Sequence, residues 1–368
     1  MAGGMATTPF LADFQQILLS SLFWEISSTE VFIRPRKLPE PSPDMAFNWM
    51  MMIDVPKDLR LLDRNHLFEK SLAHARSILK DYDPFVHKGN RGHLGLIAGS
   101  DGMAGAAILS AMAANKSGLG KLTVGIPRKY ELLIHQTIPE ALVREQNELL
   151  FSNPFHALAI GPGIGLSPLS EKLLDSAISS QKPMVLDADA LTLLARNPAY
   201  FKSLHGSSIL TPHLGEWERL FGYSDDDKLR ITTSIEYCNK YNINILMKGH
   251  VSVFITADGN FYLNGTGNSG MAKAGSGDVL TGLIGGLLAQ GYSATEAAIL
   301  GMFIHGMAGD LAQEVLGSDF MTATDQIYYL SKAFKCLRIS TQILDYLHVL
   351  LIFAPPKSIL WLPRIKTN

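Results

Sequence analysis

A short glycine-rich motif, Ala274-Gly275-Ser276-Gly277-Asp278, directly precedes an apolar stretch that predicts a helix over residues 278–290. Glycine lets backbone approach a ligand closely, and the unpaired N–H groups and dipole of a first helical turn attract phosphate. Gly275, Ser276 and Gly277 are therefore predicted to form an anion hole. The dipole also favours an ionised Asp278, which could accept a proton from a hydroxyl that attacks phosphorus. Alternatively, Asp278 only caps the helix.

Other polar side chains also follow predicted strands. Lys248-Gly249 closes one strand, where a lysine can balance nucleotide phosphates, although most lysines are simply solvated. His213 follows another strand, and a single histidine is more often structural. Asp187 and Asp189 follow a buried strand; they could hold hydrated Mg²⁺ or bond a ribose, but we favour Asp189 as a helix cap. Ligands of open α/β sheets bind at the carboxyl ends of the strands, so these loops indicate one crevice.

Short apolar strands alternate with amphipathic helices in the region that carries these motifs. Strands are predicted at residues 94–98, 121–126, 157–160, 184–187, 208–210 and 243–248, and helices at 104–116, 169–179, 216–221, 227–241 and 294–315. Asp258-Gly259 lies between two further strands, at 251–256 and 260–263, and indicates a hairpin. The pattern predicts a three-layer α/β/α fold with a mostly parallel central sheet and an antiparallel edge.

The composition favours a small-molecule enzyme. The 368 residues are 47% hydrophobic and carry a net charge of −2, so no strong field favours nucleic acid or a membrane surface. Cys238 and Cys336 are too few for a disulfide framework, which fits a reducing cytoplasm. The apolar runs at 10–23 and 343–355 are interrupted by polar residues or prolines, and the first basic residue, Arg34, lies beyond the first run. We therefore expect a cytoplasmic protein without a membrane span.

Taken together, the motifs resemble the carbohydrate-kinase-like NAD(P)H-hydrate dehydratases. The resemblance covers residues 83–330, and its motifs occur in the order of that family. They are His87-Lys88-Gly89-Asn90, Gly92-His93, Gly99-Ser100, Met103-Ala104-Gly105-Ala106, Gly161-Pro162-Gly163-Ile164-Gly165, Leu186-Asp187-Ala188-Asp189-Ala190-Leu191, Thr211-Pro212-His213, Lys248-Gly249, residues 268–278 and His305-Gly306. The 161–165 loop alone would be nonspecific, because it lacks the GxGxxG spacing of dinucleotide sites.

The resemblance implies a ribokinase-like fold and a hydro-lyase reaction. In that family, ADP or ATP phosphorylates the 6-hydroxyl of the S-epimer of hydrated NADH or NADPH, after which phosphate leaves and NADH or NADPH is restored. The resemblance also assigns roles to residues of this sequence. Asp278 is the base and a substrate contact; Ala106, Gly163 and His213 line the hydrate pocket; Lys248, Gly249, His250, Val251, Ser252, Gly275, Ser276 and Gly277 form the nucleotide site. Mg²⁺ is the implied cofactor, and no residue is assigned as a metal ligand.

Two details concern the nucleotide. The form of residues 270–278 looks more like the bacterial, ADP-using branch. His250-Val251-Ser252 departs from the family, which commonly has a small or aromatic residue followed by threonine, so nucleotide contacts there are in question.

Three regions are expected along the chain: an unassigned segment at 1–74, a dehydratase domain at 75–335 and an atypical tail at 336–368. Residues 1–70 show no sustained period and are too short for a complete epimerase domain, so we expect no epimerase activity and little loss on their deletion. A homo-oligomer, with a tetramer as one option, is expected because family members commonly assemble and the 294–315 helix has surplus apolar surface.

Two other functions remain compatible with the motifs. A glycine-rich anion hole and an aspartate would serve a kinase of a small alcohol, such as a vitamin precursor, equally well. A noncatalytic nucleotide-binding protein is the second alternative, because the unusual termini could occlude the site.

Overall fold

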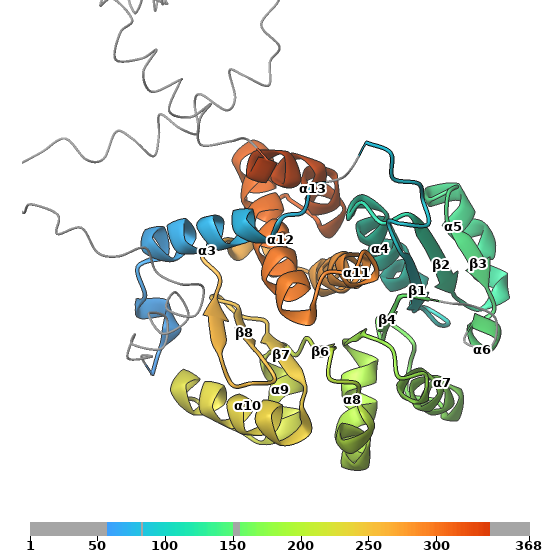
Figure 1. The fold of residues 1–368 in the computed structure, drawn as a ribbon, viewed down its shortest axis with the longest axis horizontal. Coiled ribbons are helices and arrows are strands. Elements are labelled where there is room, and N and C mark those ends of the chain that lie inside the picture. Colours follow the sequence, from blue (N-terminus) through green and yellow to red (C-terminus); the bar gives the residue numbers. More distant parts are fainter. Residues whose placement is uncertain (1–56, 82–83, 150–154, 339–368) are drawn as a thin grey trace, which may run out of the picture. The chain divides into compact units, whose positions relative to one another are not determined.

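The computed structural model describes residues 57–81, 84–149 and 155–338, and Figure 1 shows its elements. The apolar runs at 10–23 and 343–355 lie outside the described residues. Within the part of the chain that is described, no helix is both long and apolar enough to cross a membrane.

A central sheet organises the fold. Its described strands follow the order β3-β2-β1-β4-β5-β6-β7-β8-β9. The strands are β1 (His93–Ile97), β2 (Lys121–Gly125), β3 (Leu142–Arg144), β4 (Ala157–Ile160), β5 (Met184–Leu186), β6 (Ser208–Leu210), β7 (Asn244–Met247), β8 (Val253–Ile255) and β9 (Phe261–Leu263). Strands β1 to β7 pair in parallel, whereas β8 and β9 are antiparallel. The predicted mostly parallel sheet with an antiparallel edge is confirmed.

The strand order creates the place where ligands bind in such sheets. From β1 the chain moves outward through β2 to β3, then returns to β4 on the other side of β1 and continues in the opposite direction. The loops after β1 and β4 therefore diverge, and the crevice at this switch point is the usual ligand site of open α/β sheets. Residues of β1 and β4 are all buried, as expected where helices cover both faces.

Helices cover the two faces of the sheet (Figure 1). Helices α3, α4, α11, α12 and α13 contribute to one apolar core, and α7, α8 and α10 contribute to the other. The described α-helices are α3 (Arg64–Ile78), α4 (Ala104–Lys116), α5 (Glu131–Thr137), α6 (Gln146–Leu149), α7 (Pro168–Ser179), α8 (Asp189–Arg196), α9 (Leu214–Phe221), α10 (Asp227–Tyr241), α11 (Ser276–Ala289), α12 (Ala294–Leu316) and α13 (Ala323–Arg338).

Helix α11 lies at the centre of its layer and is apolar nearly all round. It packs so closely on α4 that a Cβ at Gly282 would lie 1.9 Å from the backbone oxygen of Ser110. Only glycine fits there, because any side chain would force the two helices apart. This contact fixes the axis of α11, and with it the position of the first turn that carries Asp278.

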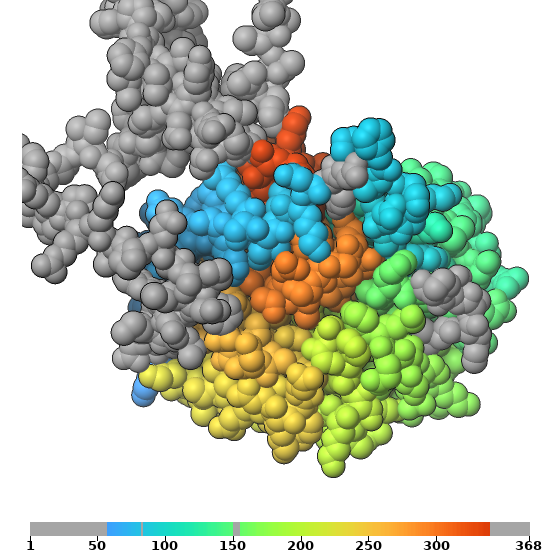
Figure 2. Space-filling model, viewed as in Figure 1, coloured from blue at the N-terminus to red at the C-terminus, as the bar shows by residue number. Residues whose placement is uncertain are grey.

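Helix α3 extends the packed domain beyond the expected boundary, and Figure 2 shows its blue residues against the orange residues of α12. The side chain of Asp63 caps it by accepting from the N–H of Asn65, and the Phe68 ring lies 6.0 Å from that of Phe303. The expected domain start at residue 75 falls inside this helix. The expectation that residues up to 70 lack periodic structure is therefore wrong for residues 64–70, which belong to α3. The helical period was hard to detect because only Leu67 and Ala75 of α3 are fully buried.

Helix α12 uses its apolar surface inside the chain. Ile299, Met302, Phe303 and Ile304 are all buried. They belong to the core that α3, α11 and α13 share. The apolar surplus predicted from the sequence is therefore covered intramolecularly, and this helix does not support the expectation of a homo-oligomer.

Candidate active site

The loops after β1 and β4 bring two of the expected substrate contacts together. Gly99 donates its N–H to the carbonyl of Pro162 at 2.8 Å, which ties the two loops at the switch point. Gly163 has a φ of +62°, and a Cβ there would lie 3.1 Å from that of Ala106. Ala106 and Gly163 are thus neighbours, and the site needs a residue without a side chain at 163.

The loops after β6 and β7 bring His213 and Lys248 together. The two residues pair as a short parallel bridge, and the N–H of Lys248 donates to the carbonyl of Pro212 at 2.8 Å. His213 also caps α9: its ring accepts from the N–H of Glu216, whose carboxylate accepts from the N–H of His213. The His213 side chain remains 58% exposed, so it can still contact a ligand from this position.

Lys248 lies in an ion-pair network with the end of β5. Its Nζ is 2.6 Å from Oδ1 of Asp187 and 3.6 Å from a carboxylate oxygen of Glu216. The other oxygen of Asp187 accepts from the Thr281 hydroxyl of α11 at 2.6 Å, and Asp187 is only 1% exposed. Burial alone would lower the pKa of Lys248, but attraction from Asp187 and Glu216 outweighs it and raises the pKa. The ammonium group is therefore charged and fixed.

Asp278 is the third residue of α11, and Gly275 is the N-cap, so Asp278 is not itself the cap. The dipole of the helix predicted an ionised carboxylate. Burial acts in the opposite direction and raises the pKa of Asp278 to about 7. The carboxylate of Asp187 adds to this rise, whereas Lys248 opposes it. An acid poised near neutral pH is well suited to accept and release a proton.

Side chains of α12 and α13 contact the backbone and side chain of Ser276 in the predicted anion hole. Gly275 has a φ of +92°, and a Cβ at Gly277 would lie 3.3 Å from Nζ of Lys248. The Ser276 carbonyl accepts from Nε2 of His305 at 2.8 Å, and the Ser276 hydroxyl is 3.2 Å from the Gln326 side-chain oxygen. Burial lowers the pKa of His305 to about 4, so this donor is a neutral ring. From the sequence, His305 is known only as part of the family motif His305-Gly306, and its contact with Ser276 is not predicted.

A cavity of about 650 Å³ opens beside these groups. Its lining includes most of the residues predicted for the nucleotide. These are Lys248, Gly249, His250, Ser252, Ser276 and Gly277, together with His213 and parts of residues 264–273. Val251 is instead 5% exposed and points to a neighbouring pocket, and among the described residues Gly275, Ala106, Gly163 and Asp278 lie outside the lining. The cavity is large enough for a nucleotide.

Two further features of the site are the contact of Asp189 and the possible ligands of a metal ion. Asp189 does not cap α8; that helix has Ala188 at its N-cap, and the Asp189 carboxylate accepts from the N–H of Gly165 at 2.8 Å. No three or more His, Cys, Asp or Glu side chains in the described residues are arranged to hold a metal ion. Mg²⁺ typically binds through one or two carboxylates, water and substrate phosphates, so this site fits Mg²⁺ delivered with a nucleotide.

Comparison with known proteins identifies the family of this fold and site. The sequence model described as NAD(P)H-hydrate dehydratase matches residues 94–332. The chain belongs to the NAD(P)H-hydrate dehydratase family. The family match covers β1 to β9 and helices α4 to α12, and therefore includes each residue that was assigned to the site.

Named relatives carry related descriptions. The chain is 37% identical over 299 residues to a bifunctional NAD(P)H-hydrate repair enzyme of Moorella thermoacetica, covering 76% of this chain and 56% of that enzyme. It thus spans about half the length of the bifunctional relatives it matches. It is 34% identical over 245 residues to an ADP-dependent (S)-NAD(P)H-hydrate dehydratase of Bacillus subtilis, covering 65% of this chain and 87% of that enzyme.

A solved structure agrees with the sequence comparisons. An ADP/ATP-dependent NAD(P)H-hydrate dehydratase from Bacillus subtilis, co-crystallised with ATP and Mg²⁺, superposes with a TM-score of 0.66 at 31% identity. The match covers 73% of this chain and 97% of that structure. A ribokinase-like superfamily protein from Enterococcus faecalis superposes with a TM-score of 0.65 at 26% identity, covering 72% of this chain and 94% of that structure. The ribokinase-like fold predicted from the sequence is therefore confirmed.

Proposed function

We propose that this protein dehydrates the S-epimer of hydrated NADH and NADPH at the expense of ADP or ATP, producing AMP or ADP and phosphate. The observation that carries the proposal is geometric: Lys248 Nζ lies beside the first turn of α11, 3.3 Å from where a Cβ at Gly277 would be. The same turn carries Asp278, and burial raises the pKa of this carboxyl to about 7. Family membership and the names of the dehydratase relatives support this substrate over others.

The residues divide the chemistry between binding and proton transfer. The Gly275, Ser276 and Gly277 backbone and Lys248 hold the terminal phosphate, assisted by the strand-end residues Gly249 to Ser252. The Asp278 carboxylate accepts the proton of the 6-hydroxyl of the hydrate. The hydroxyl oxygen attacks the terminal phosphorus of the nucleotide, and the bond between that phosphorus and the rest of the nucleotide breaks. Phosphate then leaves the ring carbon with the electrons of the C–O bond. Release of a proton from the adjacent ring carbon to solvent supplies the electrons that restore the double bond.

The hydrate occupies the switch-point side of the site in this proposal. Ala106 and Gly163 lie side by side and carry no long side chain, and His213 lines the nucleotide cavity. Mg²⁺, when bound with the nucleotide, neutralises phosphate charge and favours attack. Cys238 and Cys336 are free and buried, in keeping with the reducing cytoplasm proposed as the location.

Two alternatives are separated by one experiment. Purified hydrate, ADP or ATP, Mg²⁺ and the full chain are combined, and recovery of absorbance at the NADH wavelength is followed. Recovery coupled to phosphate release supports the dehydratase. If NADH is not recovered, and a parallel reaction with a small alcohol in place of the hydrate gives a stable phosphorylated product, the kinase is supported. Tight nucleotide binding with neither reaction would support a noncatalytic nucleotide-binding protein.

A further inference from the structure

The loop between β9 and α11 forms one wall of the nucleotide cavity. Residues 266–269 and 271–273 of this loop line the cavity. Gly267 lies near its middle and has a φ of +101°, a conformation that favours glycine. The loop carries no regular structure apart from one short turn, η4 (Ser269–Met271), so other elements must fix its shape.

Helix α12 supports the loop closely from one side. A Cβ at Gly306 would lie 2.2 Å from Oγ1 of Thr266, and one at Gly309 would lie 2.3 Å from the sulfur of Met271. Between these contacts, Oδ2 of Asp310 accepts from the N–H of Gly267 at 2.8 Å. The small residues of α12 thus allow the loop to approach, and Asp310 then binds it.

Helix α3 supports the same loop from another direction. The guanidinium of Arg64 donates to the carbonyl of Gly267 and, at 3.4 Å, to that of Gly265. The Ser71 hydroxyl adds a bond to the carbonyl of Leu263 at 3.2 Å. Gly267 is therefore held at its N–H by an acidic side chain and at its C=O by a basic one. Charge-assisted bonds of this kind are stronger than neutral ones.

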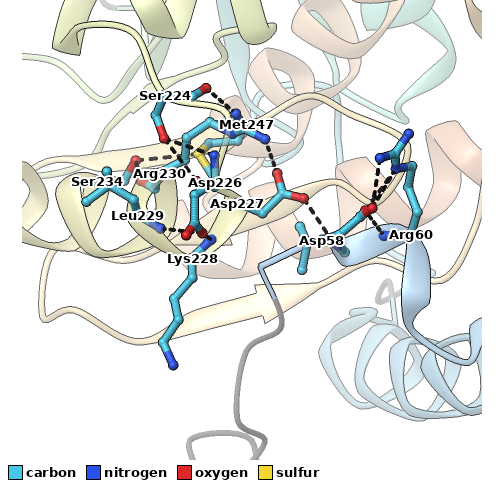
Figure 3. Close-up of polar contacts among 11 residues, drawn as sticks. Asp58, Arg60, Ser224, Asp226, Asp227, Lys228, Leu229, Arg230, Ser234 and Met247 are labelled. Atoms are coloured by element: carbon cyan, nitrogen blue, oxygen red, sulfur yellow. Dashed lines mark hydrogen bonds and ion pairs between the residues drawn. The ribbon is translucent and has the colours of Figure 1, made fainter.

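The segment before α3 is itself anchored (Figure 3). The N–H of Leu59 donates to Oδ2 of Asp227 at 2.9 Å. The N–H of Asp227 in turn donates to the carbonyl of Lys57 at 2.9 Å. Arg230 of α10 pairs with the same Asp227. Leu59 is also buried, so the segment before α3 is fixed to the domain. Arg64 is thus held in place rather than reaching out from a free segment.

We propose that Arg64 is a positioning residue for the nucleotide co-substrate. Together with Asp310, it holds Gly267 so that the 264–273 loop keeps the shape that binds ADP or ATP. The inference rests on the proposed function for the identity of the nucleotide. It assigns a role to a helix that precedes the residues matched by the family model, which begin at 94.

The test measures nucleotide affinity and turnover separately on the full chain. Arg64→Ala should weaken ADP binding in calorimetry by about ten-fold, the order expected for one charged hydrogen bond. Turnover at saturating ADP and the KM for the hydrate should stay close to those of the wild type, because Arg64 contacts neither reacting group. Arg64→Lys, which keeps the charge, should recover part of the affinity.

Arg60→Ala is the matched control. It removes the same charge from the same segment, but Arg60 is exposed and pairs with the half-buried Asp58, not with the loop. Its ADP affinity should equal that of the wild type. Equal losses in Arg60→Ala and Arg64→Ala, or unchanged affinity in Arg64→Ala, would overturn the proposal.

Two further outcomes are informative. If Arg64→Ala does not fold, Asp310→Asn tests the contact that α12 makes with Gly267. This variant should also bind ADP more weakly than the wild type, and unchanged affinity would overturn the proposal. If the wild type binds ADP but does not restore NADH from its hydrate, the proposed function fails. The calorimetric comparison of the Arg64 and Arg60 variants still decides the positioning role in that case.

Discussion

Replacing Asp278 by asparagine should reduce turnover while making the folded protein more stable. The substitution keeps size and removes the group that accepts the proton, and general-base catalysis typically contributes about a hundred- to ten-thousand-fold. We expect turnover to fall by at least about a hundred-fold, with ADP affinity nearly unchanged because backbone donors and Lys248 hold the phosphate. Wild-type turnover of the variant at saturating hydrate and ADP would refute this role for the aspartate.

The stability gain follows from the raised pKa. A shift from 3.8 to about 7 means that ionised Asp278 destabilises the native state by up to about 4 kcal/mol. Because the side chain is partly exposed, solvent screening reduces this to about 2 kcal/mol. The folded state binds the proton more tightly, so the wild type loses stability as pH rises from about 4 to about 7, and the loss levels off above that.

Thermal unfolding of the two proteins across pH tests this reasoning. At pH 8 the Asp278→Asn variant should melt several degrees above the wild type, and at pH 4 the two curves should nearly coincide. In the wild type, kcat/KM should fall below about pH 7 as the base becomes protonated. A pH-independent difference in melting temperature would show that burial does not destabilise the charged carboxylate, and the explanation of the pKa would then be wrong.

Three other predictions follow from the same network and core. Lys248→Ala should weaken ADP binding, and it should move the acid limb of kcat/KM to higher pH, because Lys248 now lowers the pKa of Asp278; an unmoved limb in the pH profile would contradict this coupling. Gly282→Ala should lower the free energy of unfolding in denaturant titration by about 1–3 kcal/mol, since a Cβ there would meet the Ser110 backbone. Light scattering of the full chain at micromolar concentration should show a homo-oligomer, with a tetramer as one option. This expectation rests only on the common assembly of family members, and a monomer alone would contradict it.

Sequence pattern was sufficient for the sheet because its strands are short, buried and separated by clear turn residues. The strands β4 and β6 and the helices α4 and α10 have the predicted bounds, and the hairpin around Asp258-Gly259 is present. Elements with mixed patterns were missed. Strand β3 lies at the sheet edge with two of its three residues exposed, and α3 has few fully buried positions. Periodicity is weak where burial is incomplete.

The site was predictable only in part, for a physical reason. Motifs identified the strand ends and the first turn of α11, because these positions follow from topology. Which partner each charge takes depends on packing between distant segments. Asp187 and Thr281 are separated by 94 positions in the sequence, yet their side chains are hydrogen-bonded at 2.6 Å. The helix dipole suggested by the sequence would lower the pKa of Asp278, but burial and the nearby Asp187 carboxylate raise it instead.

The role of α3 is not predictable from the sequence for a similar physical reason. A positioning residue such as Arg64 binds backbone carbonyls, and every residue of a loop offers the same carbonyl group. No side-chain motif in the loop therefore indicates such a partner. What can be read from the sequence is the consequence for the loop and for α12. Gly267, Gly306 and Gly309 leave room for a close approach between them, and that approach brings the loop within reach of Asp310 and Arg64. Glycines in both the loop and α12 therefore indicate where the loop is held, although the sequence does not indicate which residue holds it.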